Sequence, residues 1–393
     1  MTQPIRAANP WLVLLGLSLG VLVTNGFGRF AYGLILPAMR ADLDWTYAQA
    51  GWLNTANAMG YIVGAIGTML AIRRVSPNRL FAWGLGVTAL AILATGIVPA
   101  LWWQSLWRFI TGLAGALSFS TAGTLAARLF ADNPRRNALG IAILFGSGGG
   151  MAIVLVGATL PPMLAHWGDA AWPWAWVITG GLSVICVPMG LWAAQASRVA
   201  VGTAAARTPL PLRRILPELA GYAGFGLGYI VYLTFLSAWM KEQHASAAQV
   251  ALIWVLVGSS ITLSPFLWRG LFARHAGGRP LAMVLSGIAL GSALPVLWPN
   301  LAGLTVSALV FGACVFMAPA AVTSFARQNL PPASWGRGIS LFTVVFAFAQ
   351  TIGPWAAGML GDLTGSIGNS LLAAAIILLC GAGVALFQRP IDR

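Results

Sequence analysis

The sequence predicts an all-α membrane protein with twelve transmembrane helices in two six-helix halves and both termini in the cytoplasm. Three observations predict this fold class. Hydrophobic residues make up 59% of the 393 residues and charged residues only 8%, against about 25% charged residues in a soluble domain. The apolar residues gather in runs of the ~20 residues that a helix needs to cross a bilayer. The basic residues lie mostly between alternate runs. Such a composition excludes a soluble enzyme and a disordered chain.

Twelve apolar runs are expected to form the helices. The first, residues 11–37, is too long for the core of a signal peptide and is expected to remain as a span. Clusters of charged and helix-breaking residues at 73–79 and 132–136 end the second and fourth runs. The longest connection, 196–216, is expected to be a cytoplasmic linker between the halves 1–195 and 217–393. The other eleven runs are 47–71, 80–99, 102–127, 138–160, 173–195, 217–239, 247–268, 280–299, 301–326, 339–361 and 366–388.

The basic residues predict the orientation of these spans. If the N-terminus is cytoplasmic, 18 of the 22 lysines and arginines lie in cytoplasmic segments. Only Arg40 and Lys241 lie in the outer segments, and Arg29 and Arg108 lie within runs. Cytoplasmic loops of membrane proteins carry such an excess. We therefore expect a multi-pass protein of the inner membrane, whose net charge of +14 reflects topology rather than a nucleic-acid partner.

A shift of 200 residues aligns the two halves of the chain. Single matches occur by chance in a chain this rich in glycine and alanine, but several fall together in the first and seventh runs. A register shared through runs and loops predicts a duplicated six-helix unit whose copies are related by an axis along the membrane normal. The matches include Gly26 with Gly226, Gly28 with Gly228, Tyr32 with Tyr232, Gln49 with Gln249, Arg79 with Arg279, and Gly112 with Gly312.

This organisation resembles the major facilitator superfamily over nearly the whole chain. The fourth run contains Arg108 and Gly112, which is similar to the Arg-x-x-x-Gly pattern of that superfamily. The segment 25–32, Asn-Gly-Phe-Gly-Arg-Phe-Ala-Tyr, followed by Leu-Pro at 36–37, is similar to the bacterial YbfB/YjiJ branch. The resemblance implies the major facilitator fold and transport of a small molecule. It also implies a central cavity lined by spans one, four, seven and ten.

Two features depart from the superfamily pattern. The loop between the second and third runs keeps Arg73, Arg74 and Arg79 but has no aspartate, so a gate clasp that needs that carboxylate is not expected. The Gly-Pro pair that many antiporters of the superfamily carry in span five is missing, and Gly353-Pro354 lies instead in span eleven. This second departure weakens an assignment as an antiporter.

Arg29 is the first candidate for a substrate-binding residue. It lies eight residues before Pro37, which corresponds to a depth of about 12 Å in a helix. An arginine at such depth costs at least about 2.5–3.5 kcal/mol and marks a functional site by default. The alternative is a structural arginine that bonds to helix carbonyls.

Arg108 is the second candidate, at a similar expected depth in the fourth run. Ion binding and bracing of one helix against another remain equally open for this residue. None of the eight acidic residues is expected at mid-membrane depth, so neither arginine has an obvious counter-charge. A substrate that carries a carboxylate or phosphate would supply one, because guanidinium binds two such oxygens at once.

Seven further polar residues lie within the expected spans and could orient the polar atoms of a substrate. The alternative role of each is a hydrogen bond between helices. Tyr32 and Tyr232 occupy matching positions of the repeat, so substrate binding and interhelical bonding remain about equally open for them. The seven are Asn25, Tyr32, Asn54, Asn57, Tyr229, Tyr232 and Gln350.

A secondary transporter of an organic anion is therefore the favoured function, and the alternative is an efflux pump for uncharged amphipathic compounds. An enzyme is not expected, since no histidine or acid lies beside a nucleophile within the membrane. The sequence has no Gly-x-x-x-x-Gly-Lys-Ser/Thr loop, so ATP is not expected to drive the transport directly. No cofactor or metal is expected, and the chain is expected to act as a monomer. Protons remain a possible coupling ion, carried by Glu218, by Asp362, by an outer-loop carboxylate or by the substrate itself.

Overall fold

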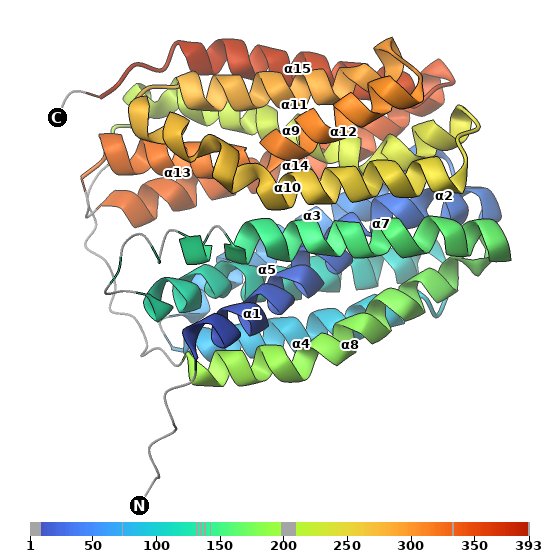
Figure 1. Cartoon of the computed structure of the whole chain (residues 1–393), viewed down its shortest axis with the longest axis horizontal. Coiled ribbons are helices and arrows are strands. Elements are labelled where there is room, and N and C mark those ends of the chain that lie inside the picture. The colour runs from blue at the N-terminus through green and yellow to red at the C-terminus, as the bar shows by residue number, and fades with distance from the viewer. Residues whose placement is uncertain are drawn as a thin grey trace, which may run out of the picture.

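The computed structural model describes residues 9–72, 74–130, 133, 136, 139–141, 143–197, 210–331 and 334–391. In this part of the chain every regular element is helical, as the sequence predicts, and the helices form one elongated bundle (Figure 1). Helix α1 (Pro10–Val21) begins and α15 (Gly368–Leu386) ends at the same end of the bundle. We call this end the near end and the opposite one the far end.

The helices before residue 197 form the lower group in Figure 1. They are α1, η1 (Leu22–Phe30), α2 (Tyr32–Asp42), α3 (Tyr47–Ala71), α4 (Pro77–Thr95), α5 (Leu101–Leu129), η2 (Ile143–Ser147), α7 (Gly148–Trp167), η3 (Asp169–Ala171) and α8 (Trp172–Ala196). The later helices are α9 (Leu212–Glu242), α10 (Ala247–Arg274), α11 (Arg279–Leu297), α12 (Leu301–Val315), α13 (Met317–Asn329), α14 (Trp335–Thr364) and α15.

Eleven helices in the described residues are long and apolar enough to cross a membrane. The twelfth expected span corresponds to α3, which has 25 residues but falls outside that set. Polar side chains such as Asn54 and Asn57 lower its hydrophobicity, and both are buried. Because α3 packs chiefly against α5 and α14, these side chains meet protein rather than lipid.

Two boundaries differ from the sequence-based expectation. The first span covers Pro10–Asp42 rather than 11–37, because Pro37 lies inside α2. Helix α9 begins at Leu212 and accommodates Pro217, so residues 212–216 of the expected linker are helical. Residues 198–209 of that linker lie outside the described residues, as do residues 73, 132, 134 and 135 of the two breaker clusters.

The first span is not a regular α-helix, which its sequence did not predict. Residues Leu22–Phe30 form a π-helix between α1 and α2, and such wider turns occur often at functional sites. Glycine permits tight packing here, since a Cβ at Gly26 would collide with the side chain of Ala152 on α7. The segment that contains Arg29 is therefore a π-helix rather than an α-helix, and it packs closely against α7.

Two of the matches at a spacing of 200 residues have similar local contacts in the structure. Gln49 and Gln249 each complete a capping box, with Thr46 at the start of α3 and Ser246 at the start of α10. Gly112 lies against the backbone oxygen of Asn57, and Gly312 lies against that of Val257, 200 residues further along the chain. The repeated residues thus begin and pack equivalent helices.

Candidate functional site

Arg29 lies in η1 and its side chain links three parts of the chain. It is 6% exposed. Its Nη2 donates a hydrogen bond to Oε1 of Gln350 on α14, and its guanidinium lies 5.3 Å from the ring centroid of Tyr61 on α3. A guanidinium has five N–H donors, and the bond to Gln350 is the only hydrogen bond of this side chain among the described residues. Most donors of Arg29 are therefore free for a ligand.

Gln350 joins Arg29 to a second predicted site residue. The hydroxyl of Tyr229 on α9 donates to the same Oε1 at 3.0 Å. Gln350 is fully buried, and its Nε2 has no partner in the described structure. A buried donor without an acceptor costs about 1–3 kcal/mol. The structure thus brings Arg29, Gln350 and Tyr229 together and leaves an unused donor beside them.

Arg108 has a different environment although it lies close by. Its Nη1 donates to the carbonyl oxygen of Gly28 at 2.6 Å, and its Nη2 donates to Oδ1 of Asn54 at 2.9 Å. The guanidinium is fully buried and faces the rings of Tyr32 and Trp176, at 5.0 and 5.6 Å. Backbone and amide oxygens and two aromatic faces therefore stabilise this cation in place of an acid. These contacts are those of a brace between α5, η1 and α3.

The two predicted asparagines on α3 belong to this brace. Nδ2 of Asn54 donates to Oγ1 of Thr234 on α9 at 2.7 Å, so Asn54 also ties α3 to a later helix. Nδ2 of Asn57 donates to the backbone oxygen of Arg108 at 3.0 Å. Asn25, in η1, is buried, with 6% of its surface exposed.

The tyrosine pair that the repeat singled out is not brought together. The hydroxyl of Tyr32 donates to the backbone oxygen of Ala50 at 2.7 Å, and that of Tyr232 lies 2.9 Å from Oγ of Ser307. Both tyrosines are fully buried. Their hydroxyls bond one helix to another, which was the alternative role considered for them.

The sequence did not single out the contacts that join early and late helices at the far end. Asp362 on α14 accepts hydrogen bonds from the backbone N–H groups of Tyr47 and Ala48 at the start of α3, each at 2.8 Å. The hydroxyl of Tyr47 donates to Glu242. Lys241 forms an ion pair of 2.6 Å with Asp169. The sequence places Glu242 and Asp169 in outer loops and Asp362 at the end of a span, and it does not predict these contacts.

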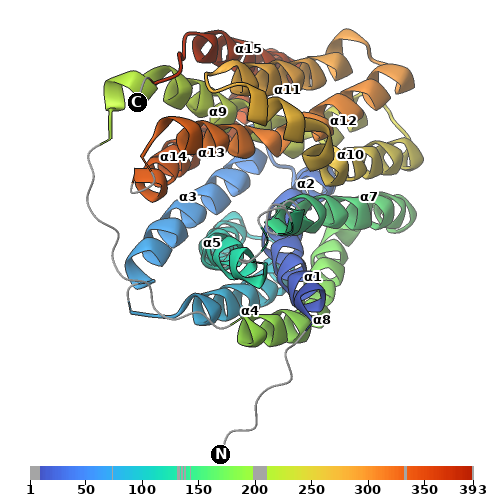
Figure 2. The ribbon, with the colours of Figure 1, turned by 60° about the vertical axis from the view of Figure 1, so that its left-hand side comes forward.

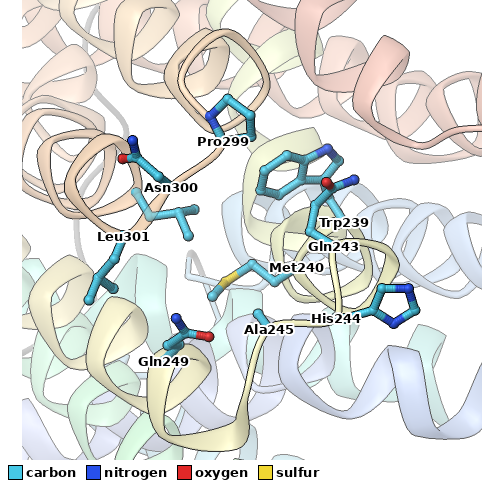
Figure 3. A pocket seen from close by; sticks show the side chains of 10 residues that line it. Trp239, Met240, Gln243, His244, Ala245, Gln249, Pro299, Asn300 and Leu301 are labelled. Atoms are coloured by element: carbon cyan, nitrogen blue, oxygen red, sulfur yellow. The ribbon is translucent and has the colours of Figure 1, made fainter.

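A small cavity also opens at the far end, with a volume of about 250 Å³. It lies between the α9–α10 and α11–α12 connections, as Figure 3 shows. Gln243, His244, Gln249 and Asn300 give it a polar lining. None of the nine predicted site residues lines it. Within the described residues no group of three His, Cys, Asp or Glu side chains could hold a metal ion.

Comparison with known proteins identifies the family. The model of the family described as "Uncharacterised MFS-type transporter YbfB" matches residues 21–386. The chain belongs to this family. It is therefore a major facilitator superfamily transporter, as the sequence predicts, and a multi-pass protein of the inner membrane.

Two relatives extend over almost the whole chain. The inner membrane transport protein YdhP of Escherichia coli (strain K12) is 25% identical over 388 residues, covering 96% of this chain and 91% of YdhP. The uncharacterized MFS-type transporter YceJ of Bacillus subtilis (strain 168) is 24% identical over 376 residues, covering 91% and 92%. Both names describe transporters rather than enzymes.

Solved structures share the fold. A bacterial homolog of the human lysosomal transporter Spinster, in an inward-facing and unoccupied conformation, superposes with a TM-score of 0.72 at 16% identity and 98% coverage of both chains. The nucleoside transporter NupG superposes with a TM-score of 0.69 at 15% identity, covering 96% of this chain and 98% of NupG. At these identities the likeness shows the fold alone.

Proposed function

We propose that the protein is a secondary transporter that moves a small organic anion across the inner membrane by alternating access, with Arg29 as the anion-binding residue. The observation that carries this proposal is the unused donor capacity at Arg29. A buried guanidinium with one hydrogen bond to protein is suited to bind two oxygens of a carboxylate or phosphate. Gln350 supplies a further donor, its unpartnered Nε2.

We also propose that Arg108 is not part of the binding site. Its Nη1 and Nη2 donors are bonded to Gly28 and Asn54, and its faces are covered by Tyr32 and Trp176. Binding an anion there would break the contacts that hold α5 against η1. We assign Arg108, Asn54, Asn57 and Tyr32 to bracing.

Alternating access requires contacts that form at one end of the bundle and break when that end opens. The bonds from Asp362 to the start of α3, and from Tyr47 to Glu242, join early and late helices at the far end. The α3–α14 packing continues to the middle of the bundle, where Tyr61 clusters with Ala347. Figure 2 shows the two helices side by side. These contacts favour a state closed at the far end.

A binding experiment on purified protein tests the proposal. The probes are benzoate and its uncharged analogue benzamide, measured by calorimetry on wild type and Arg29→Ala. We expect Arg29→Ala to weaken binding of benzoate by about 2–5 kcal/mol and to leave any binding of benzamide unchanged. Arg128→Ala is the matched control, because Arg128 is an exposed arginine at the near end of α5.

The outcomes separate the two candidate functions. Equal binding of benzoate and benzamide to the wild type would contradict the anion proposal and favour efflux of uncharged amphipathic compounds. Equal loss of both probes in a folded Arg29→Ala variant would make Arg29 a structural residue. The functional unit is proposed to be one chain, since all the residues of the Arg29 site come from it.

A further inference from the structure

We infer that the anion bound by Arg29 carries an aromatic ring. This inference rests on the proposed function and names the substrate class of the same site. It is carried by the juxtaposition of free polar donors with aromatic side chains from four helices, α3, α5, α9 and α14. A saturated anion would use the donors but not these rings.

The polar end of the site is defined by Arg29 and Gln350. Oε1 of Gln350 already accepts bonds from Arg29 and from Tyr229, so it cannot repel an incoming anion as an unpaired acceptor would. The Nε2 of the same amide is buried and has no partner in the part of the chain that the structure describes. A carboxylate that approached the guanidinium could therefore accept from Arg29 and from this Nε2, and it would satisfy a donor that the fold leaves unpaired.

One aromatic wall continues from this polar end along α9 and α14. The ring of Tyr229 stacks on Phe225 with centroids 4.5 Å apart, and Phe225 lies 5.4 Å from Phe346. Tyr222 stacks on Phe225 and on Phe346, at 5.5 and 5.4 Å. The angles between these stacked rings are 17–27°. The four rings are thus nearly parallel and begin at the tyrosine that bonds to Gln350.

A second group of rings approaches from the early helices. Tyr61 on α3 carries the guanidinium of Arg29 over its face and lies 6.4 Å from Phe119 on α5. Phe119 in turn lies 4.8 Å from Phe145 in η2. Tyr61 also clusters with Ala347, the neighbour of Phe346 in sequence. Arg29 therefore lies between aromatic side chains of early and late helices.

The exposure of α14 shows which of its rings belong to the interior. Phe348 is 67% exposed on the outside of the bundle. Phe346, two residues earlier, points to the opposite side of the helix and packs on Tyr222, Phe225 and Tyr229. Phe346 and Phe119 are still partly exposed, so their rings are not fully covered by protein. Phe346 and Phe348 form a natural pair for comparison.

A ring ligand gains more from these walls than a saturated ligand of the same charge and size. Aromatic pairs in offset or edge-to-face contact contribute beyond the area that they bury, by an amount that corresponds to a few-fold to about tenfold in affinity per contact. Two such walls predict a preference on the order of tenfold or more for a ring over a saturated cycle.

The test compares benzoate with cyclohexanecarboxylate on the purified full chain. Both probes are monoanions with a six-membered carbon ring, and only benzoate is aromatic. We expect benzoate to bind on the order of tenfold more tightly to the wild type. Phe346→Leu should weaken benzoate several-fold and leave cyclohexanecarboxylate nearly unchanged. Phe348→Leu, on the outer face of the same helix, is the matched control and should change neither.

Each outcome has a distinct meaning. Equal affinities for the two carboxylates would overturn the aromatic class and leave the anion proposal standing. Absence of binding by both carboxylates would overturn the proposed anion function together with this inference. Should Phe346→Leu fail to fold, as judged by thermal unfolding, the comparison of the two carboxylates on the wild type still decides.

Discussion

Arg29 and Arg108 are two buried arginines in adjacent parts of the bundle, and their surroundings differ in one decisive respect. Arg108 donates to Gly28 and Asn54 and is fully buried. Among the described residues Arg29 makes one side-chain hydrogen bond, to Gln350, and it keeps 6% of its surface exposed. Although Nε of Arg108 has no partner among the described residues, we propose that its two bonds and complete burial mark a bracing cation, and that the single bond and residual exposure of Arg29 mark a binding one. Four experiments, ordered from the largest expected effect to the smallest, test the roles proposed for these two arginines and for Asp362 and Tyr232.

Substitution of Arg108 should have the largest effect on stability. Arg108→Ala leaves Oδ1 of Asn54 and the carbonyl of Gly28 without their donor. Each unsatisfied buried group costs about 1–3 kcal/mol, so we expect unfolding to become easier by about 2–5 kcal/mol. Thermal unfolding in detergent measures this loss of stability, with Arg128→Ala as the control. A variant of unchanged stability that no longer binds benzoate would reverse the assigned roles.

A conservative change at Arg29 should affect binding but not folding. Arg29→Lys keeps the positive charge but replaces the planar fork by a single ammonium, which binds two oxygens less well. We expect benzoate binding to weaken by about 2 kcal/mol, while thermal unfolding stays near that of the wild type. Calorimetry measures benzoate binding, and a thermal melting curve measures the stability of the variant. Wild-type affinity in Arg29→Lys would mean that the charge alone suffices.

A third experiment tests the far-end contacts of Asp362, which we propose to form in only one conformation of the transporter. Asp362→Asn keeps one oxygen for the backbone of Tyr47 and Ala48 but loses the charge and one acceptor. We expect the closed far end to be weakened by about 1.5 kcal/mol, with benzoate binding largely intact. Spin labels on Asp44→Cys and His244→Cys, with the native cysteines replaced, should report a longer distance between the far-end connections.

Glu218→Gln is the control for Asp362→Asn. Glu218 is a buried carboxylate near the start of α9, where its backbone N–H donates to Gln388, and it takes no part in the far-end contacts. We expect neither the label distance nor benzoate binding to change. A loss of benzoate binding in Asp362→Asn at an unchanged label distance would place this carboxylate in the binding site instead.

The smallest effect is expected at Tyr232, the repeat partner of Tyr32. Tyr232→Phe removes one hydrogen bond to Ser307, whose own hydroxyl still donates to Gly291. We expect a loss of about 0.5–1 kcal/mol in stability and no change in benzoate affinity. Tyr229→Phe is the paired variant, since the hydroxyl of Tyr229 orients Gln350. Weaker binding in Tyr232→Phe would place this tyrosine in the site after all.

The candidate residues show how far the sequence reached. A polar residue inside an apolar run is visible without a structure, and this property selected all nine. This property could not separate substrate-binding residues from bracing residues, because an asparagine in either role looks the same within a run of apolar residues. The aromatic neighbours were missed for the opposite reason. Tyr61, Phe119 and Phe346 are ordinary residues in membrane helices, and only their approach to Arg29 distinguishes them.

The sequence by itself determined the membrane class, the family, the approximate positions of the helices and the capping boxes that begin α3 and α10. These properties are local, since an apolar run or a capping box depends on residues within a few turns. The tertiary structure alone shows which groups each arginine contacts. The hydrogen-bond partner of Arg29 is 321 residues away in sequence, and the two partners of Arg108 are 80 and 54 residues away. Such partners are fixed by helix packing, which no local pattern encodes.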